Sequence, residues 1–318
     1  MPKQFSVVTI AVGKTYYLNL AKNLLLSFLK WNSNNEIEFL LVTDNSDFFN
    51  EFCNIKKVEI KNIEVLDEDK SFTSKFLLYN HVAATENLFI DCDCIIYSDL
   101  TSVFKKFEKE DFSVIGRKLQ TGNFFCDIEQ LLVKLNLSYF PKFVGSVYYF
   151  KNNEMAKAIF EMAINLKAKY DELGFIRLRG KENEEPLFAA AMANFNQQPI
   201  DDDGSIKADA MFFTNFKCNV ITGTAILENK NLSDNGYQSP KISKPAIVHY
   251  NDRYTELANY LADQVRLRSH LPQLLNSIFI QVKYLIPSFF TTELKNMFRP
   301  LYHQLLGPSK IKKIRRVD

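Results

Sequence analysis

The stretch Asn87-Leu88-Phe89-Ile90-Asp91-Cys92-Asp93-Cys94-Ile95-Ile96-Tyr97 places two carboxylates, two residues apart, at the end of an apolar segment. The apolar residues predict a buried strand. Because side chains alternate along a strand, Asp91 and Asp93 should face one way and the two cysteines the other. Two like charges that face one spot repel each other unless a cation lies between them. Oxygen ligands suit Mg(II) or Mn(II), which commonly join protein carboxylates to phosphates. The pair favours a metal-diphosphate site over the alternative of two solvated loop carboxylates.

Apolar strand-like segments and helical segments alternate about four times in the first 115 residues. This order predicts an α/β fold, with a mostly parallel sheet that is covered by helices on both faces. Ligands of such sheets bind outside the carboxyl ends of the strands. The turn after Val12 and the two aspartates should therefore lie on the same edge. The predicted strands are 5–12, 36–42, 58–66, 87–91, 143–150, 219–227 and 246–250. The predicted helices begin after Thr15, at 74, at 99, shortly before Met155 and at 186.

The chain has 318 residues, of which 47% are hydrophobic and 24% are charged, so it can bury a sizeable core. Its five cysteines are scattered and odd in number, which favours a reducing compartment over a disulfide framework or a zinc site. The first residues lead directly into a strand without the apolar region of a signal peptide. We expect a cytoplasmic protein with no nucleic-acid partner.

The C-terminal segment differs in charge from the rest of the chain. From Arg266 onward it holds ten Lys and Arg but only two acidic residues, although the whole chain is nearly neutral. Aromatic and apolar groups alternate there with cations, and no run reaches the about 20 apolar residues that span a bilayer. We predict a catalytic domain over 1–265 and a helical, basic and aromatic appendage over 266–318. The appendage either lies on the anionic cytoplasmic face of a membrane as a peripheral segment or packs on the body.

Three further residues fit a site for a nucleotide diphosphate. Tyr16 follows the first strand and could stack on a nucleobase, although core packing explains a tyrosine equally well. Lys75 precedes the aspartates and could neutralise a diphosphate, although a lone lysine is more often only solvated. His249 ends an apolar run and could be a third metal ligand, although a histidine there is more often structural. Their joint occurrence favours the functional interpretation.

With these residues in place, the chain resembles the GT-A glycosyltransferases, most closely the family-eight enzymes of the glycogenin and lipooligosaccharide galactosyltransferase type. The order and spacing of the matching pieces span residues 5–250. The pieces are Thr9-Ile10-Ala11 with Tyr16, Lys75-Phe76-Leu77-Leu78, Leu88 to Asp93 with Asp99-Leu100, Phe143 to Val147, Glu184 to Phe188, and Val248-His249-Tyr250.

The resemblance implies a role for each matching position. Near the nucleotide it implies base contacts from Thr9, Ala11 and Tyr16, a diphosphate or sugar contact from Lys75, and a ribose contact from Asp91. Asp91, Asp93 and His249 would bind Mn(II) or Mg(II), Gly145 and Ser146 would lie beside the donor sugar, and Glu184 and Glu185 would be the catalytic pair beneath the reacting carbon.

Two segments depart from the family pattern. Val144-Gly145-Ser146 stands where the family usually has Asn-Ser-Gly, which puts a contact to a donor hydroxyl in question. After His249 the family usually has Gly-x-x-Lys-Pro-Trp, whereas Asn251-Asp252-Arg253-Tyr254 follows here. Arg253 is the available substitute for the lysine that would bind the leaving diphosphate. The departures indicate a divergent relative.

The sequence therefore predicts a metal-dependent, retaining transferase that moves a sugar from a nucleotide sugar, a UDP-sugar, to a glycan or lipid-linked acceptor. One alternative is a phosphatase of the haloacid dehalogenase type, which also has Asp-x-Asp after an apolar strand but usually on its first strand. The other is a non-catalytic protein that binds nucleotide sugars or glycans.

Overall fold

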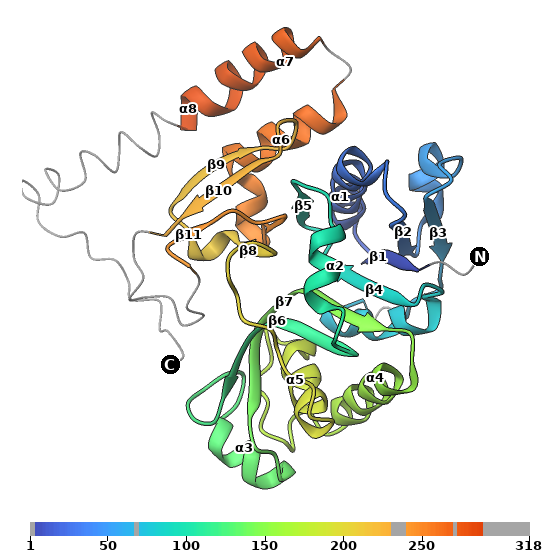
Figure 1. The fold of residues 1–318 in the computed structure, drawn as a ribbon, viewed down its shortest axis with the longest axis vertical. Helices are drawn as coiled ribbons and strands as arrows, with labels where there is room; N and C mark the ends of the chain where they lie inside the picture. The colour runs from blue at the N-terminus through green and yellow to red at the C-terminus, as the bar shows by residue number, and fades with distance from the viewer. Residues whose placement is uncertain (1–3, 67–69, 230–239, 270–271, 289–318) are drawn as a thin grey trace, which may run out of the picture.

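A six-stranded sheet forms the centre of the computed structural model, which describes residues 4–66, 70–229, 240–269 and 272–288 (Figure 1). Its strands are β1 (Phe5–Ala11), β2 (Glu38–Thr43), β3 (Val58–Asn62), β4 (Glu86–Ile90), β6 (Phe112–Leu119) and β7 (Phe140–Lys151). They lie in the order β3-β2-β1-β4-β7-β6. The first four strands are mutually parallel, whereas β7 is antiparallel to both β4 and β6. The predicted α/β fold with a mostly parallel sheet is confirmed.

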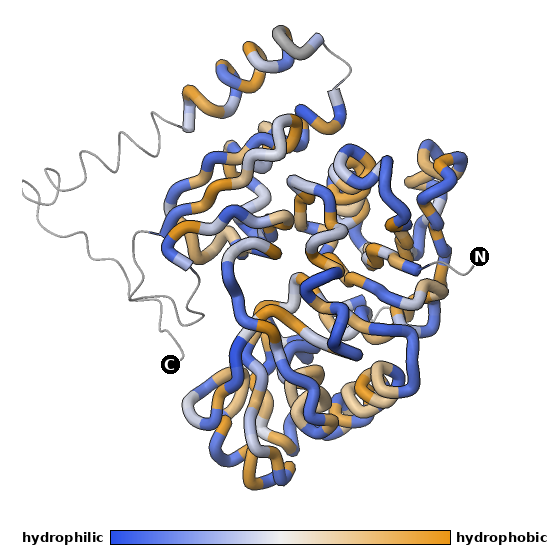
Figure 2. Tube along the Cα trace, in the orientation of Figure 1, coloured by the Kyte–Doolittle hydropathy of each residue, from blue (hydrophilic) through white to orange (hydrophobic). Residues whose placement is uncertain are grey.

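Helices cover both faces of this sheet, as predicted. Buried residues of α1 (Thr15–Asn32) and α2 (Thr101–Phe107) join one apolar cluster, and those of α4 (Glu154–Lys167) and α5 (Glu184–Asn194) join the other. α4 and α5 lie below the sheet in Figure 1, and α1 lies above it. Orange, hydrophobic stretches occur in the strands between them in Figure 2, which agrees with a core on each side of the sheet.

The segment that was predicted as an α-helix after residue 74 is instead a run of 3-10 turns, η3 (Phe72–His81). The side chains of four consecutive residues, 73–76, are all buried. One face of an α-helix could not bury four consecutive side chains, because residues on one face are three or four apart. The tighter, irregular backbone places the side chain of Lys75 inside the protein.

The helix α3 (Ile128–Leu135) was not predicted, although the sequence carries its signals. The side chain of Asp127 accepts a hydrogen bond from the backbone N–H of Gln130 at 3.0 Å, which caps the first turn. Asn136 ends the helix with a φ of 52°, a left-handed conformation that asparagine tolerates well.

Two three-stranded sheets lie beyond the carboxyl end of β4. Their strands are β5 (Cys94–Ile96), β12 (Ile247–His249) and β8 (Lys207–Asp209) in one, and β9 (Asn215–Asn219), β10 (Thr224–Glu228) and β11 (Ile242–Ser243) in the other. Three short 3-10 segments are connections: η1 (Ser46–Phe52) joins β2 to β3, η4 (Ala210–Phe212) joins β8 to β9, and η6 (Asp252–Glu256) follows β12. β12 pairs with β5 on one side and with β8 on the other, so residues from three distant parts of the chain meet there.

The helix α6 (Ala258–Arg268) joins the C-terminal region to the body. The guanidinium group of Arg268 donates to the side chains of Asn19 and Asn23 in α1 at 3.1 and 2.7 Å. The predicted boundary between residues 265 and 266 therefore lies inside a helix that packs on the domain. After it come α7 (Gln273–Ile280), a π-helical turn η7 (Gln281–Leu285) and α8 (Ile286–Ser288).

The rest of the predicted appendage, 289–318, lies outside the described residues. Among the residues that the structure describes, every helix is too short or too polar to cross a membrane.

We expect the substitution Asp263→Ala to lower the free energy of unfolding by about 3 kcal/mol, because it removes one partner of a buried network. Asp263 in α6 is fully buried and accepts hydrogen bonds from the Tyr97 hydroxyl at 2.6 Å, the Val220 N–H at 2.9 Å and Arg266 at 2.6 Å. Urea unfolding measures the change. Asp203→Ala, which removes an exposed partner of Lys106, is the control and should cost under about 1 kcal/mol. Equal effects of the two substitutions would contradict the assignment.

Candidate functional site

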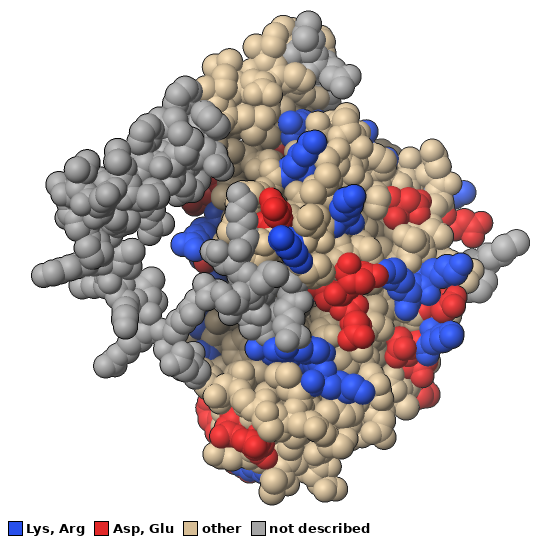
Figure 3. Space-filling view, turned by 60° about the vertical axis from the view of Figure 1, so that its left-hand side comes forward, with Lys and Arg blue, Asp and Glu red and all other residues tan. Residues whose placement is uncertain are grey.

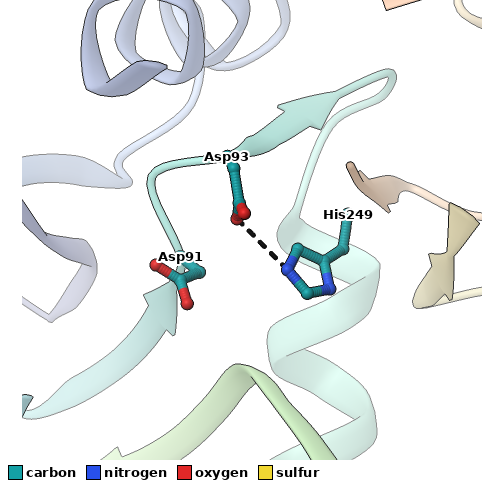
Figure 4. A group of neighbouring side chains, drawn as sticks. All are labelled: Asp91, Asp93 and His249. Atoms are coloured by element: carbon teal, nitrogen blue, oxygen red, sulfur yellow. Dashed lines mark ion pairs between the residues drawn. The ribbon is translucent and has the colours of Figure 1, made fainter. Parts of the chain in front are cut away.

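Asp91 and Asp93 lie in the short turn between β4 and β5, and His249 ends β12 beside them (Figure 4). The backbone fixes both aspartates: the Asp91 N–H donates to the carbonyl oxygen of Ser146 at 2.9 Å, and the Asp93 carbonyl accepts from Tyr250 N–H at 3.0 Å. Cys92 and Cys94 are buried in the core, whereas both aspartates are partly exposed. The alternation predicted from the sequence is therefore present, although a turn rather than a strand produces it.

The donor set of these three residues fits a divalent cation. One ligand atom from each of Asp91, Asp93 and His249 lies within 4.8 Å of the other two. Asp93 Oδ1 is buried, lies 3.2 Å from His249 Nε2, and accepts no hydrogen bond of good geometry from the described residues. Two carboxylates and an imidazole nitrogen are a donor set that can hold a divalent cation. Burial lowers the pKa of His249, but the charge of Asp93, followed by the hydrogen bond with Asp209, outweighs burial and raises the pKa to about 10.

A buried lysine joins this group to a second pair of acids. The Lys75 ammonium lies 2.6 Å from Glu184 Oε1, 2.9 Å from Asp91 Oδ2 and 2.8 Å from the carbonyl oxygen of Gly145. Burial lowers the pKa of Lys75, but the charges of Asp91 and Glu184 outweigh burial and raise it, so the lysine stays protonated. The Tyr148 hydroxyl also donates to Glu184 Oε1, at 3.0 Å. Glu184 Oε2 is buried without a hydrogen-bond partner among the described residues.

Gly145 is required by the close approach of β7 to the two glutamates that begin α5. Its N–H donates to Glu185 Oε1 at 2.6 Å. A Cβ atom at this position would lie 2.5 Å from the Tyr148 hydroxyl and 2.6 Å from Glu184 Oε1, so a larger residue would displace these two side chains from their present contacts. Burial, followed by the charge of Glu184, raises the pKa of Glu185 to about 7. The pair thus combines Glu184, which is bound to Lys75, with Glu185, which keeps its proton up to nearly neutral pH.

The remaining predicted residues lie at different depths. Tyr16 is 48% exposed, and its hydroxyl bonds to Thr255 Oγ1 at 2.8 Å, which ties the start of α1 to η6 after His249. Thr9 and Ala11 are buried in β1. Ser146 is fully buried, and Arg253 is exposed on η6. Seven predicted residues are therefore brought together, namely Lys75, Asp91, Asp93, Gly145, Glu184, Glu185 and His249.

Lys207 and Asp209 of β8 were not predicted, although both touch this site. The Asp209 Oδ1 atom lies 2.7 Å from His249 Nδ1, and the Lys207 ammonium lies 3.1 Å from Asp209 Oδ2. Burial raises the pKa of Asp209, but the Lys207 charge and the bond to His249 outweigh it and lower the pKa to about 2. A sequence signal did exist: two opposite charges alternate there with Ile206, Ala208 and Ala210 in an otherwise apolar segment.

We expect Glu185→Gln to change how stability depends on pH in the metal-free protein. From its ordinary value of 4.5 up to about 7, the folded protein keeps the Glu185 proton while the unfolded chain releases it. The free energy of unfolding should therefore fall as pH rises through this window, by at most about 3 kcal/mol. Solvent screening at the partly exposed edge of the Glu185 side chain makes the fall smaller. Urea unfolding between pH 4 and pH 8 measures this slope.

The glutamine cannot ionise, so its profile should lack the fall that Glu185 contributes. Glu161→Gln, an exposed position in α4, is the matched control and should keep the wild-type profile. Parallel profiles for wild type and Glu185→Gln would show that Glu185 ionises as an ordinary glutamate.

No protein-family model and no curated protein matches the sequence. Solved structures do match. Glycosyltransferase GlyE of Streptococcus pneumoniae TIGR4 aligns with a TM-score of 0.43 and 14% identity over 63% of this chain and 45% of its own, so this chain spans less than half the length of that protein.

Three further structures align more completely, each with a TM-score of 0.51. Galactosyltransferase LgtC, in complex with donor and acceptor sugar analogues, is 12% identical over 86% of this chain and 99% of its own. Mouse xyloside xylosyltransferase 1 is 11% identical over 79% and 99%. The bifunctional glycosyltransferase WbbM is 11% identical over 87% and 52%. The chain therefore has the fold of the GT-A glycosyltransferases.

Proposed function

We propose that this protein is a metal-dependent glycosyltransferase that uses a nucleotide sugar, a UDP-sugar, as donor. The observation that carries the proposal is the contact between the possible metal ligands and the acidic pair: Lys75 binds both Asp91 and Glu184. The residues that we propose to bind a cation and a diphosphate therefore adjoin Glu184 and Glu185, where the resemblance to the family-eight enzymes places the transferred sugar. The fold, which is shared with several glycosyltransferases, supports this interpretation.

A divalent ion bound by Asp91, Asp93 and His249 would stabilise the negative charge that develops on a leaving diphosphate. The other residues act on the sugar side. Glu184, with its unpaired Oε2, would stabilise positive charge at the reacting carbon. Glu185, protonated below about pH 7, can donate a hydrogen bond to a sugar hydroxyl or acceptor. We infer transfer with retention from the resemblance of the sequence to the family-eight enzymes, in which an acidic pair at the place of Glu184 and Glu185 would lie beneath the reacting carbon.

The alternatives predict different behaviour. In a haloacid dehalogenase phosphatase the Asp-x-Asp motif follows the first strand, whereas here it follows β4. Hydrolysis of a generic aryl phosphate that is abolished by Asp91→Ala would favour the phosphatase. A binding protein remains an alternative because Val144 and the residues after His249 depart from the family pattern. Donor binding in calorimetry without turnover on any acceptor would favour it.

We expect Asp93→Ala to reduce Mn(II)-dependent release of UDP from a UDP-sugar by about 100-fold or more, because it removes a metal ligand at the leaving group. A screen of donors by thermal shift with Mn(II) selects the sugar nucleotide, and UDP release is then measured with and without acceptor. Asp203→Ala, an exposed aspartate whose partner is Lys106, is the matched control and should retain full activity. Turnover that needs no metal or survives Asp93→Ala would refute the proposed mechanism.

We further propose that the acceptor is a glycan or a lipid-linked glycan and that the C-terminal region holds the protein at an anionic membrane. Helix α7, the turn η7 and helix α8 carry exposed apolar side chains, and orange segments mark apolar residues along this part of the chain in Figure 2. The exposed side chains are Leu275, Ile278, Phe279, Val282 and Ile286. The Lys283 ammonium lies 5.0 Å from the Phe279 ring, so a cation accompanies these apolar side chains. On the body, in the face shown in Figure 3, acidic and basic side chains are interspersed.

We expect the full chain to float with vesicles that contain an anionic lipid, and less with neutral vesicles, because the apolar side chains and the cations act together. Replacing Ile278, Phe279 and Val282 by serine should reduce the bound fraction at least several-fold. The control replaces Val133, an exposed apolar residue in α3, by serine and should leave binding unchanged. Equal flotation of the triple variant and wild type would remove the membrane proposal but not the transferase.

A further inference from the structure

The side chains of Lys207 and Asp209 form a buried charged network behind the candidate metal ligand His249. β8 and β12 are parallel neighbours in which Asp209 stands opposite His249. Asp209 Oδ1 lies 2.7 Å from His249 Nδ1, while His249 Nε2 faces Asp93 on the other side of the ring. A carboxylate that accepts from Nδ1–H leaves Nε2 as the nitrogen that is available to a metal.

Asp209 is itself fixed by two donors. The Lys207 ammonium lies 3.1 Å from Asp209 Oδ2, and the Ser146 hydroxyl donates to Asp209 Oδ1 at 3.1 Å. Lys207 also donates to Ser146 Oγ at 3.1 Å and to the carbonyl oxygen of Val144 at 2.9 Å. Each of these side chains is at most 8% exposed, so water competes little for the bonds.

The network connects the two sides of the metal site. On one side, Asp209 holds the His249 ring. On the other, Ser146 binds Asp209 through its hydroxyl and accepts the backbone N–H of Asp91 at its carbonyl oxygen, at 2.9 Å. One residue of β7 therefore sets where Asp91 lies and also where Asp209 lies. The distance between two of the three ligands depends on this link.

We propose that Asp209, held by Lys207 and Ser146, is a positioning residue that orients His249 and fixes its separation from Asp91 for binding of a divalent metal. The inference rests on the metal site of the proposed function. It also assigns Ser146 a task besides a contact with the donor sugar. Its hydroxyl is committed to Asp209, which accounts for a serine at this place in β7.

Binding of Mn(II) to the full chain tests this, measured by the loss of the electron paramagnetic resonance signal of free Mn(II) and by calorimetry, without any substrate. Asp209→Ala should weaken Mn(II) binding about 10- to 100-fold. Asp209→Asn keeps an oxygen that accepts from Nδ1–H and should recover most of the affinity. Ser146→Ala removes one bond, should weaken binding about 3-fold, and serves as the second variant if Asp209→Ala does not fold.

Asp263→Ala is the matched control, because Asp263 is equally buried and also bound to a cation, Arg266, but does not touch His249. It should lower thermal stability and leave Mn(II) affinity unchanged. If wild type binds Mn(II) and folded Asp209→Ala or Ser146→Ala binds it equally well, the positioning role is wrong and the proposed function stands. If wild type binds no Mn(II), the proposed metal site and the positioning role of Asp209 are both wrong.

Discussion

The buried ammonium group of Lys75 is the interaction on which the site depends. It lies within 2.9 Å of oxygens from Asp91 and Glu184, two acids that are 93 positions apart in the sequence, and it also binds the Gly145 carbonyl. Without a cation at this point, the two carboxylates would repel each other in a poorly solvated space. The 3-10 backbone of η3, Gly145 in β7 and the start of α5 together bring these groups to one ammonium.

The second constraint is the small sheet that contains β5, β12 and β8. The main sheet can place Asp91 and Asp93 at its carboxyl edge, but it cannot supply a third ligand. Pairing of β12 with β5 sets His249 opposite Cys94, and pairing with β8 sets it opposite Asp209. Helix α1 secures β5 from behind, since the Ser27 hydroxyl accepts the Ile96 N–H at 3.0 Å. Strand pairing on both sides of β12 therefore fixes the backbone position of His249.

The sequence was informative where chemistry required a particular residue type. An Asp-x-Asp at the end of an apolar strand, and a histidine at the end of another, predicted a metal site, and the structure brings ligand atoms of these three residues within 4.8 Å of one another. The sequence was less informative about Thr9 and Ala11, whose burial in β1 follows from the packing of α1. Two opposite charges in an apolar segment marked Lys207 and Asp209 as unusual, but only the pairing of β8 with β12 identifies His249 as their neighbour.

By itself, the sequence determined the α/β class, the alternation that creates a sheet edge, and the acids and histidine that can bind a cation there, because local periodicity and residue chemistry suffice for these. Only the tertiary structure decided that Lys75 neutralises Asp91 and Glu184, that Gly145 admits the acidic pair, and that Asp209 holds His249. Lys75 and Asp91 are 16 positions apart, and the other pairs are separated by 40 to 109 positions. A local sequence pattern does not identify partners at such separations.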